Sequence, residues 1–190
     1  VNKWCELCGT AFYKIAWDKS AGEVIGSLKN NAVFEGEVSI RAVSPFEIFP
    51  DNQSIADINE QKSIIYARLT DVSLVKDCYG VTVKPDDKEF SGVDDKTKVV
   101  LIEKYEKPTL DFSEGKLTIV AGDSLLYLGP LPYVNGKNNK REYPFVKQVC
   151  NLLPNSFFGS SIIERLIPVQ RAFNAVKNRK HEFMNRITMG

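Results

Sequence analysis

The C-terminal stretch from residue 155 onward constrains the fold more than any other part of the chain. Its apolar residues recur at alternating spacings of four and three: Ile162, Leu166, Val169, Phe173, Val176, Phe183 and Ile187. Only Lys180 interrupts this series. Residues three and four positions apart share one face of an α-helix. The pattern therefore predicts one long amphipathic helix, of a kind that packs against a neighbour.

We expect the opposite face of this helix to be basic. Two acidic residues, Glu164 and Glu182, accompany six cations: Arg165, Arg171, Lys177, Arg179, Lys180 and Arg186. These cations are our candidate residues for a subunit interface or for a surface that faces DNA. We also expect Pro168 to begin the helix, because the first turn does not need the N–H that proline lacks.

The charge of the chain is divided unevenly. Residues 1–95 contain 10 Lys and Arg against 16 Asp and Glu (−6), whereas residues 96–190 contain 15 against 8 (+7). Unlike patches favour head-to-tail contact between identical subunits; compensation within one chain is the alternative. Our sharper hypothesis is that Arg171, Lys177, Arg179 and Lys180 meet the acidic first half of an adjacent subunit. Otherwise they are a solvated side of the helix.

The remainder of the chain is rich in strands. Alternation and turn residues predict strands at 10–17, 23–28, 33–43, 63–69, 98–107, 116–120, 124–128 and 143–149. We expect the first to be covered on both faces and 33–43 to be half-buried. Short helices are predicted at 3–8, 54–61 and 72–79, with Ser54 and Asp71 as N-caps and with Gly9 and Gly80 at C-termini. Residues 84–97 should form an exposed loop.

These elements predict an α+β fold: an antiparallel, strand-rich body with short helices and a long C-terminal amphipathic helix. We expect a body over residues 1–155 and a helical segment over 156–190 that together form one structural unit. The start at Val1 and the stop beside a helix suggest an internal piece of a longer protein.

The sequence contains little that indicates catalysis. Cys5 and Cys8 have the CxxC spacing of zinc and redox sites, but a tetrahedral zinc site needs two more ligands and His181 is the one histidine. Residues 86–87 and 94–95 are paired aspartates that could bind a divalent ion weakly. No nucleotide-binding or metalloprotease motif is present. We therefore expect no enzyme activity, catalytic residue, metal or cofactor.

The composition bears on two possible partners, a membrane and DNA. No apolar run approaches the ~20 residues of a membrane span, so we expect no membrane contact. Residues 137–141 and the cations of the helix could touch phosphates, but no aromatic residues alternate with them as in stacking platforms. Any DNA contact should be loose and independent of sequence.

Several short motifs, in this order and spacing, resemble one family. They lie at residues 4–17, 43–51, 102–108, 115–120, 143–146, 158–161 and 168–174. In them the chain is similar to an internal piece of the portal (head-to-tail connector) protein of tailed double-stranded DNA bacteriophages, of the podovirus-like branch. The resemblance covers nearly the whole chain and implies the outer wing region of a portal subunit.

That resemblance implies a structural role. It implies a dodecameric ring at one capsid vertex, assembled in the bacterial host cytoplasm, through which DNA is packaged and ejected. Capsid protein, terminase and tail adaptors would be partners, the last two through parts outside this piece. Two rivals stay open: another virion or head-tail adaptor module that forms no ring, and a nuclease fragment that uses the aspartate-rich loop.

Overall fold

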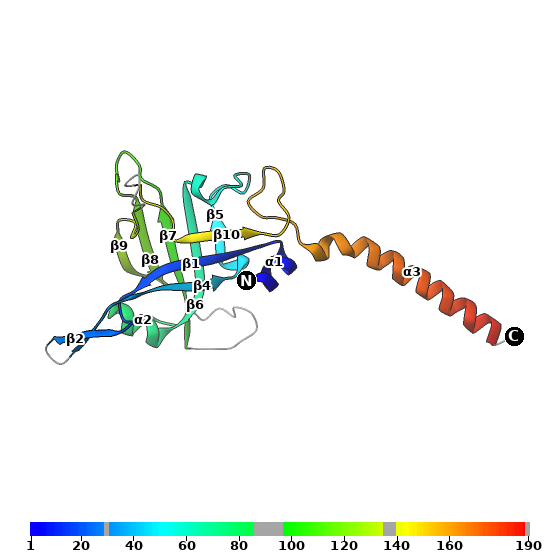
Figure 1. The fold of residues 1–190 in the computed structure, drawn as a ribbon, viewed down its shortest axis with the longest axis horizontal. Coiled ribbons are helices and arrows are strands. Elements are labelled where there is room, and N and C mark those ends of the chain that lie inside the picture. Colours follow the sequence, from blue (N-terminus) through cyan, green and yellow to red (C-terminus); the bar gives the residue numbers. More distant parts are fainter. Residues whose placement is uncertain (29–30, 86–96, 135–139, 189–190) are drawn as a thin grey trace.

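A computed structural model describes residues 1–28, 31–85, 97–134 and 140–188. A strand-rich body occupies one end of the molecule, and one long helix leaves it (Figure 1). The first half of the chain forms α1 (Asn2–Cys8), β1 (Thr10–Asp18), β2 (Val24–Leu28), β3 (Asn31–Phe34), β4 (Glu37–Val43), η1 (Pro45–Glu47), β5 (Ile48–Pro50), η2 (Ile58–Glu60), β6 (Ser63–Asp71) and α2 (Val72–Tyr79). The second half forms β7 (Lys98–Glu106), β8 (Lys116–Ala121), β9 (Ser124–Gly129), β10 (Phe145–Val149) and α3 (Ile162–Thr188).

The larger sheet is an antiparallel sheet of five strands in the order β5-β6-β7-β8-β9. Alternate residues of β7 are buried, so Leu101, Glu103 and Tyr105 face inward while Ile102 and Lys104 face outward. Gly115 adopts a left-handed φ of 69° in the turn before β8. The predicted strands 98–107, 116–120 and 124–128 are confirmed.

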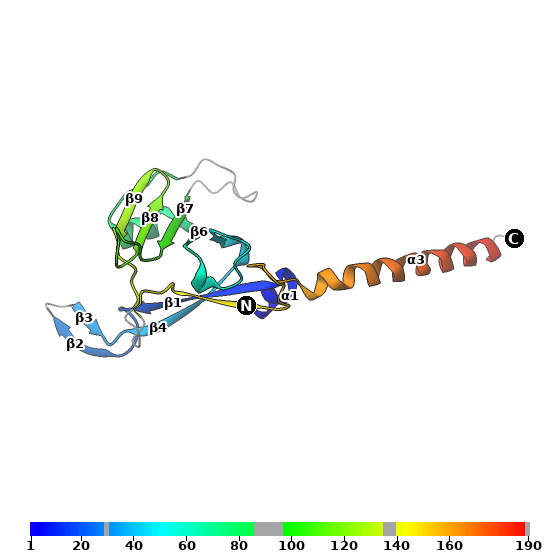
Figure 2. The same ribbon diagram turned by 90° about the horizontal axis from the view of Figure 1, so that it is seen from above.

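The smaller sheet has three antiparallel strands in the order β10-β1-β4. Its strands cross those of the larger sheet steeply, and the two sheets form two layers (Figures 1 and 2). Phe12 and Phe145 enter the core from the smaller sheet, and Phe145 meets Tyr66 and Tyr105 edge to face. The antiparallel α+β architecture that the sequence predicts is confirmed.

The predicted strand at 33–43 is wrong as a single element. Residues 31–34 pair with β2 in a separate hairpin, and β4 begins only at Glu37. Gly36 divides them with a φ of 85°, a conformation that L side chains rarely adopt. A Cβ at Gly36 would lie 2.6 Å from the Trp17 ring, so the indole requires glycine there.

The short helices are confirmed at two of three places. The chain forms α1 and α2 as expected, with left-handed Gly9 and Gly80 at their ends. The predicted helix at 54–61 is instead the single turn η2, and Asp57 rather than Ser54 caps it. The cause is the buried amide of Gln61, whose Nε2 donates to the carbonyls of Asn52 and Ile55 and holds that segment in turns.

The long helix is confirmed, but its predicted start at Pro168 is wrong. α3 begins at Ile162 and Pro168 lies inside it. The Ser161 side-chain oxygen accepts a hydrogen bond from the Glu164 N–H at 2.9 Å, which supplies an N-cap and starts the helix nearly two turns before Pro168. Ser161 followed three residues later by Glu164 is the signature of a capping box, and this signal was present in the sequence.

Candidate assembly interface

The long helix contacts α1 at its base and then projects away from the body, and none of the described residues buries its apolar side chains. We call Ile162, Leu166, Val169, Phe173, Val176, Phe183 and Ile187 the apolar stripe. Figures 1 and 2 show α3 leaving the body beside α1 and continuing alone to the C-terminus. Each stripe residue is between 46% and 66% exposed, and no residue of α3 is buried. A stripe of this size is expected to bind something.

The candidate cations of α3 flank the apolar stripe rather than lie opposite it. Successive residues of an α-helix turn by about 100°, so Arg165, Arg179 and Arg186 align along one edge of the stripe. Lys177 lies on the other edge, 5.7 Å from the centroid of the Phe173 ring. Lys180 lies within the stripe, and Arg171 alone is opposite. The expectation of a basic face opposite the stripe is therefore wrong for most of these residues.

The root of α3 is fixed to the body by two glycines. Backbone of Gly9 and Gly159 lies so close that a Cβ on Gly9 would be 2.2 Å from the Gly159 carbonyl oxygen. The Gly159 N–H donates to Thr10 Oγ1 at 2.8 Å, and the Cys150 N–H donates to the Gly9 carbonyl at 2.9 Å. The sequence predicted Gly9 as a helix cap and gave no signal of this contact. The helix therefore leaves the body from an anchored base.

The three-stranded sheet has a second unpartnered apolar surface. Its outer apolar face consists of Ile15, Trp17, Val38, Ile40 and Val146, which are 37% to 65% exposed. Ile15 is paired with Ile40 and Trp17 with Val38, so these side chains form one continuous patch. The expectations that residues 10–17 are covered on both faces and that Val38 and Ile40 face a core are wrong. Alternation placed these residues on one face correctly, but the described residues leave most of that face open.

A groove of about 410 Å³ indents this outer apolar face. Ile15, Trp17, Val38 and Val146 line it together with Tyr133 from the segment after β9. The backbone N–H of Trp17 donates to the Tyr133 hydroxyl at 3.0 Å, which fixes the Tyr133 ring at the edge of β1. The groove is lined mainly by apolar atoms and therefore suits apolar side chains rather than a charged small molecule.

A buried polar cluster joins the two sheets. Lys14 of β1 donates to Glu103 Oε2 at 2.5 Å, and the Tyr105 hydroxyl donates to the same oxygen at 2.5 Å. The Lys14 ammonium also lies 4.8 Å from the centroid of the Tyr66 ring. Burial lowers the pKa of Lys14 and the Glu103 carboxylate opposes that shift. Burial, reinforced by Glu103, strongly raises the pKa of Tyr105.

This cluster lies between the two sheets and joins them. The Lys14 and Glu103 side chains are 17% and 5% exposed, so the pair is largely removed from water. No motif in the sequence marks these residues. The signal was the alternation of β1, which places Lys14 on the same face as Phe12 and thus toward the core.

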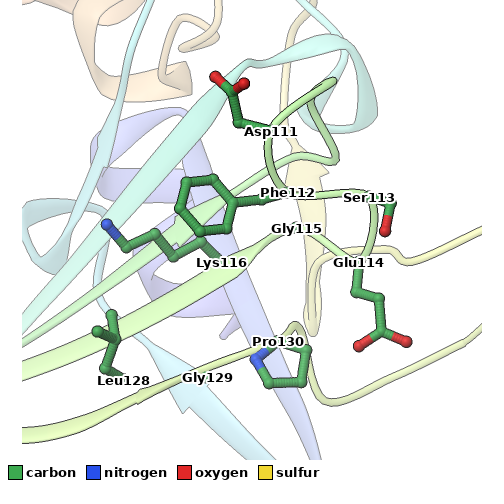
Figure 3. A pocket seen from close by; sticks show the side chains of 9 residues that line it. All are labelled: Asp111, Phe112, Ser113, Glu114, Gly115, Lys116, Leu128, Gly129 and Pro130. Carbon is green, nitrogen blue, oxygen red and sulfur yellow. The ribbon is translucent and has the colours of Figure 1, made fainter.

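A surface pocket of about 400 Å³ lies where the β7–β8 turn meets the end of β9. In Figure 3 the Phe112 ring lies beside the Lys116 side chain, and the Asp111 and Glu114 carboxylates point away from each other. Glu114 forms an ion pair with Arg141 at 3.0 Å. The Asp111 and Glu114 carboxylates do not converge on one point, so this pocket lacks the paired acids that hydrolytic or metal chemistry needs.

The structure brings Cys5 and Cys150 side by side but does not gather the cysteines around the single histidine. Cys5 is buried, and its pKa is raised by burial and by the adjacent Cys150 thiol. Cys8 is half-buried on the same helix, and His181 is exposed on α3. Among residues 1–28, 31–85, 97–134 and 140–188, no group of three His, Cys, Asp or Glu side chains could hold a metal ion. The aspartates at 86–87 and 94–95 lie outside the described residues.

Comparison of the chain with known protein families and with curated proteins finds no match in either. None of the helices in the described part of the chain is long and apolar enough to cross a membrane. The unpartnered surfaces of α3 and of the three-stranded sheet are therefore the main guide to function.

Proposed function

We propose that the chain is a wing-region piece of a structural subunit in the portal ring of a tailed double-stranded DNA bacteriophage. The observation that carries this proposal is the 27-residue helix α3, which leaves an anchored root with its whole apolar stripe exposed. A subunit that functions alone would cover such a stripe, whereas an assembly subunit needs it uncovered. The order of short motifs along the chain supports the same assignment.

In this role the chain is an assembly component and not an enzyme. The complete protein would form a dodecameric ring in the virion and contact capsid protein, terminase and tail adaptors. Double-stranded DNA would pass through the ring without sequence-specific readout, since the cations of α3 can contact phosphates but no row of aromatic residues accompanies them.

Negative-stain electron microscopy of the full-length parent protein tests this proposal. We expect closed rings with a central hole. Monomers or dimers under several salt concentrations would overturn the ring assignment and favour an adaptor module. Metal-dependent cleavage of DNA by the chain would instead favour the nuclease alternative.

A further inference from the structure

We propose that the apolar stripe of α3 docks on the outer apolar face of the three-stranded sheet of a second copy of this chain. This inference deepens the proposed function and rests on its association of identical subunits. It names the two surfaces that meet, which the portal assignment by itself does not. Each surface is unpartnered within its own chain.

The positions of the two surfaces exclude contact within one chain. The β2–β3 hairpin and the free end of α3 lie at opposite ends of the molecule (Figure 2). The close packing of Gly9 on Gly159 anchors the base of the helix in this direction. Within the described residues the helix therefore does not lie on its own sheet, whereas a second copy can bring a helix to it.

The outer apolar face can hold about three turns of α3. It runs along β1 from Tyr13 to Trp17, roughly 17 Å, because Ala11 at the start of the same face is fully buried. The 27 residues of α3 span roughly 40 Å at 1.5 Å per residue, so part of the apolar stripe suffices to cover this face and fill its groove.

Pairing of α3 with another α3 is disfavoured by charge. The stripe follows a heptad repeat, and the residues that flank it are Ile163, Arg165, Gln170, Ala172, Lys177, Arg179, Met184 and Arg186. These flanking positions include four cations and no carboxylate, so neither helix orientation supplies an attractive ion pair. A parallel pair in register would also place Lys180 against its own copy, which is repulsive.

The body supplies the opposite charge. Residues 162–188 contain 6 Lys and Arg against 2 Asp and Glu (+4), and the rest of the chain contains 19 against 22 (−3). Four exposed carboxylates lie at the hairpin end of the three-stranded sheet: Asp18, Glu23, Glu35 and Glu37. Asp18 and Glu37 are register partners, and alternation places both on the face opposite to Trp17 and Val38. These acids therefore attract the cations of α3 toward the hairpin end of the sheet and not across the outer apolar face itself.

The outer side of the five-stranded sheet is a poorer receptor. There, Lys104 and Glu106 form an ion pair at 2.7 Å in the middle of the surface, and Lys104 is paired with Thr118. Docking an apolar stripe on this side would remove these charged groups from water, which costs free energy. The corresponding centre of the three-stranded sheet carries no charge: Tyr13 lies between Ala42 and Val146, and its hydroxyl already donates to Gln148 Oε1 at 2.8 Å.

The docking geometry is heterologous, because a helix of one copy meets a sheet of the next. Each copy then still offers a free helix at one end and a free sheet at the other. Repetition of such a contact closes into a ring or extends into a filament, depending on the rotation between copies.

Photo-crosslinking of the full chain tests the contact directly. The photo-crosslinker p-benzoylphenylalanine replaces Phe173, unlabelled and heavy-isotope-labelled copies are mixed, and crosslinked peptides are identified by mass spectrometry. We expect crosslinks between copies from position 173 to peptides of β1 or β4. Crosslinks to α3 of the other copy, crosslinks within one copy, or no crosslinks would each overturn the inference.

A substitution on the receptor surface gives the second test. Ile40→Glu places a charge on an exposed side chain, so the fold is retained, and we expect at least a tenfold weaker self-association by analytical ultracentrifugation. The matched control is Leu125→Glu on β9, which has similar exposure (57% against 65%) but lies on the other sheet. Equal effects of the two substitutions, or a wild-type chain that stays monomeric, would contradict the docking.

The two proposals can fail separately. Rings of the parent protein with crosslinks from position 173 to a surface other than β1 and β4 would preserve the portal assignment and overturn the docking. Head-to-tail filaments or short oligomers with the expected crosslinks would preserve the docking and overturn the ring.

Discussion

Lys14 of β1 and Glu103 of β7 form an ion pair 2.5 Å long that joins the two sheets of the body. Charges as buried as these require each other, because removing one partner leaves the other charge without compensation. Tyr105 donates a second hydrogen bond to the same carboxylate. The pair therefore fixes the position of the three-stranded sheet on the five-stranded sheet, and with it the direction of the outer apolar face.

Glu103→Gln should destabilise the body by about 3 kcal/mol, because Lys14 then retains a buried charge without its partner. The double variant Lys14→Met/Glu103→Leu should recover most of this loss. Urea unfolding measures the free energy of unfolding of Glu103→Gln and of the double variant. The control is Lys104→Met, which breaks the more exposed pair with Glu106 and should cost less than about 1 kcal/mol. Similar losses for Glu103→Gln and Lys104→Met would show that the inter-sheet pair has no special role.

Alkaline pH should unfold the body through its buried tyrosines. Burial raises the pKa of Tyr66, Tyr79, Tyr105 and Tyr143 above the ordinary value of 10.0. Below pH 10 these hydroxyls are protonated in both states and their contribution is fully present. As pH rises above 10, the unfolded chain releases these protons while the folded chain keeps them, so the free energy of unfolding falls.

Tyr105→Phe should make that fall shallower by about 1.4 kcal/mol per pH unit above pH 10. Urea unfolding at a series of pH values gives the slope for each protein. The lowered pKa of Lys14 acts in the opposite direction as pH approaches 10.5, but Lys14 is present in both proteins and its effect largely cancels. Identical slopes would show that Tyr105 releases its proton equally in both states.

Gly9→Ala should loosen the base of α3 and destabilise the body far more than Gly80→Ala. Both glycines have a left-handed φ, 79° and 71°, and both follow a short helix. A Cβ at Gly9 would meet the Gly159 carbonyl at 2.2 Å, whereas a Cβ at Gly80 meets nothing within 4 Å. Gly80→Ala should cost only the conformational penalty of about 1–2 kcal/mol. Thermal unfolding of the two variants measures the difference, and equal losses would exclude steric contact as the cause.

Pro168→Ala should raise the helical content of α3. Proline inside a helix removes one backbone hydrogen bond and costs about 3 kcal/mol. Because α3 is wholly exposed, no packing within the chain depends on the proline. Circular dichroism on heating should show the helix persisting to a higher temperature. The opposite sign is expected for Ser161→Ala, which removes the cap and costs about 1 kcal/mol.

Charge reversal at Lys177 and Arg179 should weaken self-association, and more strongly at low salt, where screening is least. These residues flank the apolar stripe, whereas Arg171 lies on the opposite side of α3. Arg171→Glu is therefore the matched control for Arg179→Glu and should change association little. Analytical ultracentrifugation at two salt concentrations measures self-association of the variants reversed at Lys177, at Arg179 and at Arg171. Loss of association by Arg171→Glu equal to that of Arg179→Glu would refute the flanking arrangement.

The helices and strands of this chain could be predicted largely from short-range patterns of residues, because local signals specify them. Spacings of four and three made α3 a helix, alternation made β7, β8 and β9 strands, and Gly9 and Gly80 ended α1 and α2. Even the corrected start of α3 had a local signal in Ser161 and Glu164. Periodicity also placed Val38 and Ile40 on one face correctly.

Which faces are covered depends on contacts that the local patterns do not encode. Val38 and Ile40 are apolar, yet their face is open, whereas Lys14 is charged and lies between the sheets because Glu103 meets it there. The close approach of Gly9 to Gly159 joins segments far apart in the sequence. Periodicity identifies which residues share a face but not what lies opposite it, since that depends on contacts between segments distant in the sequence.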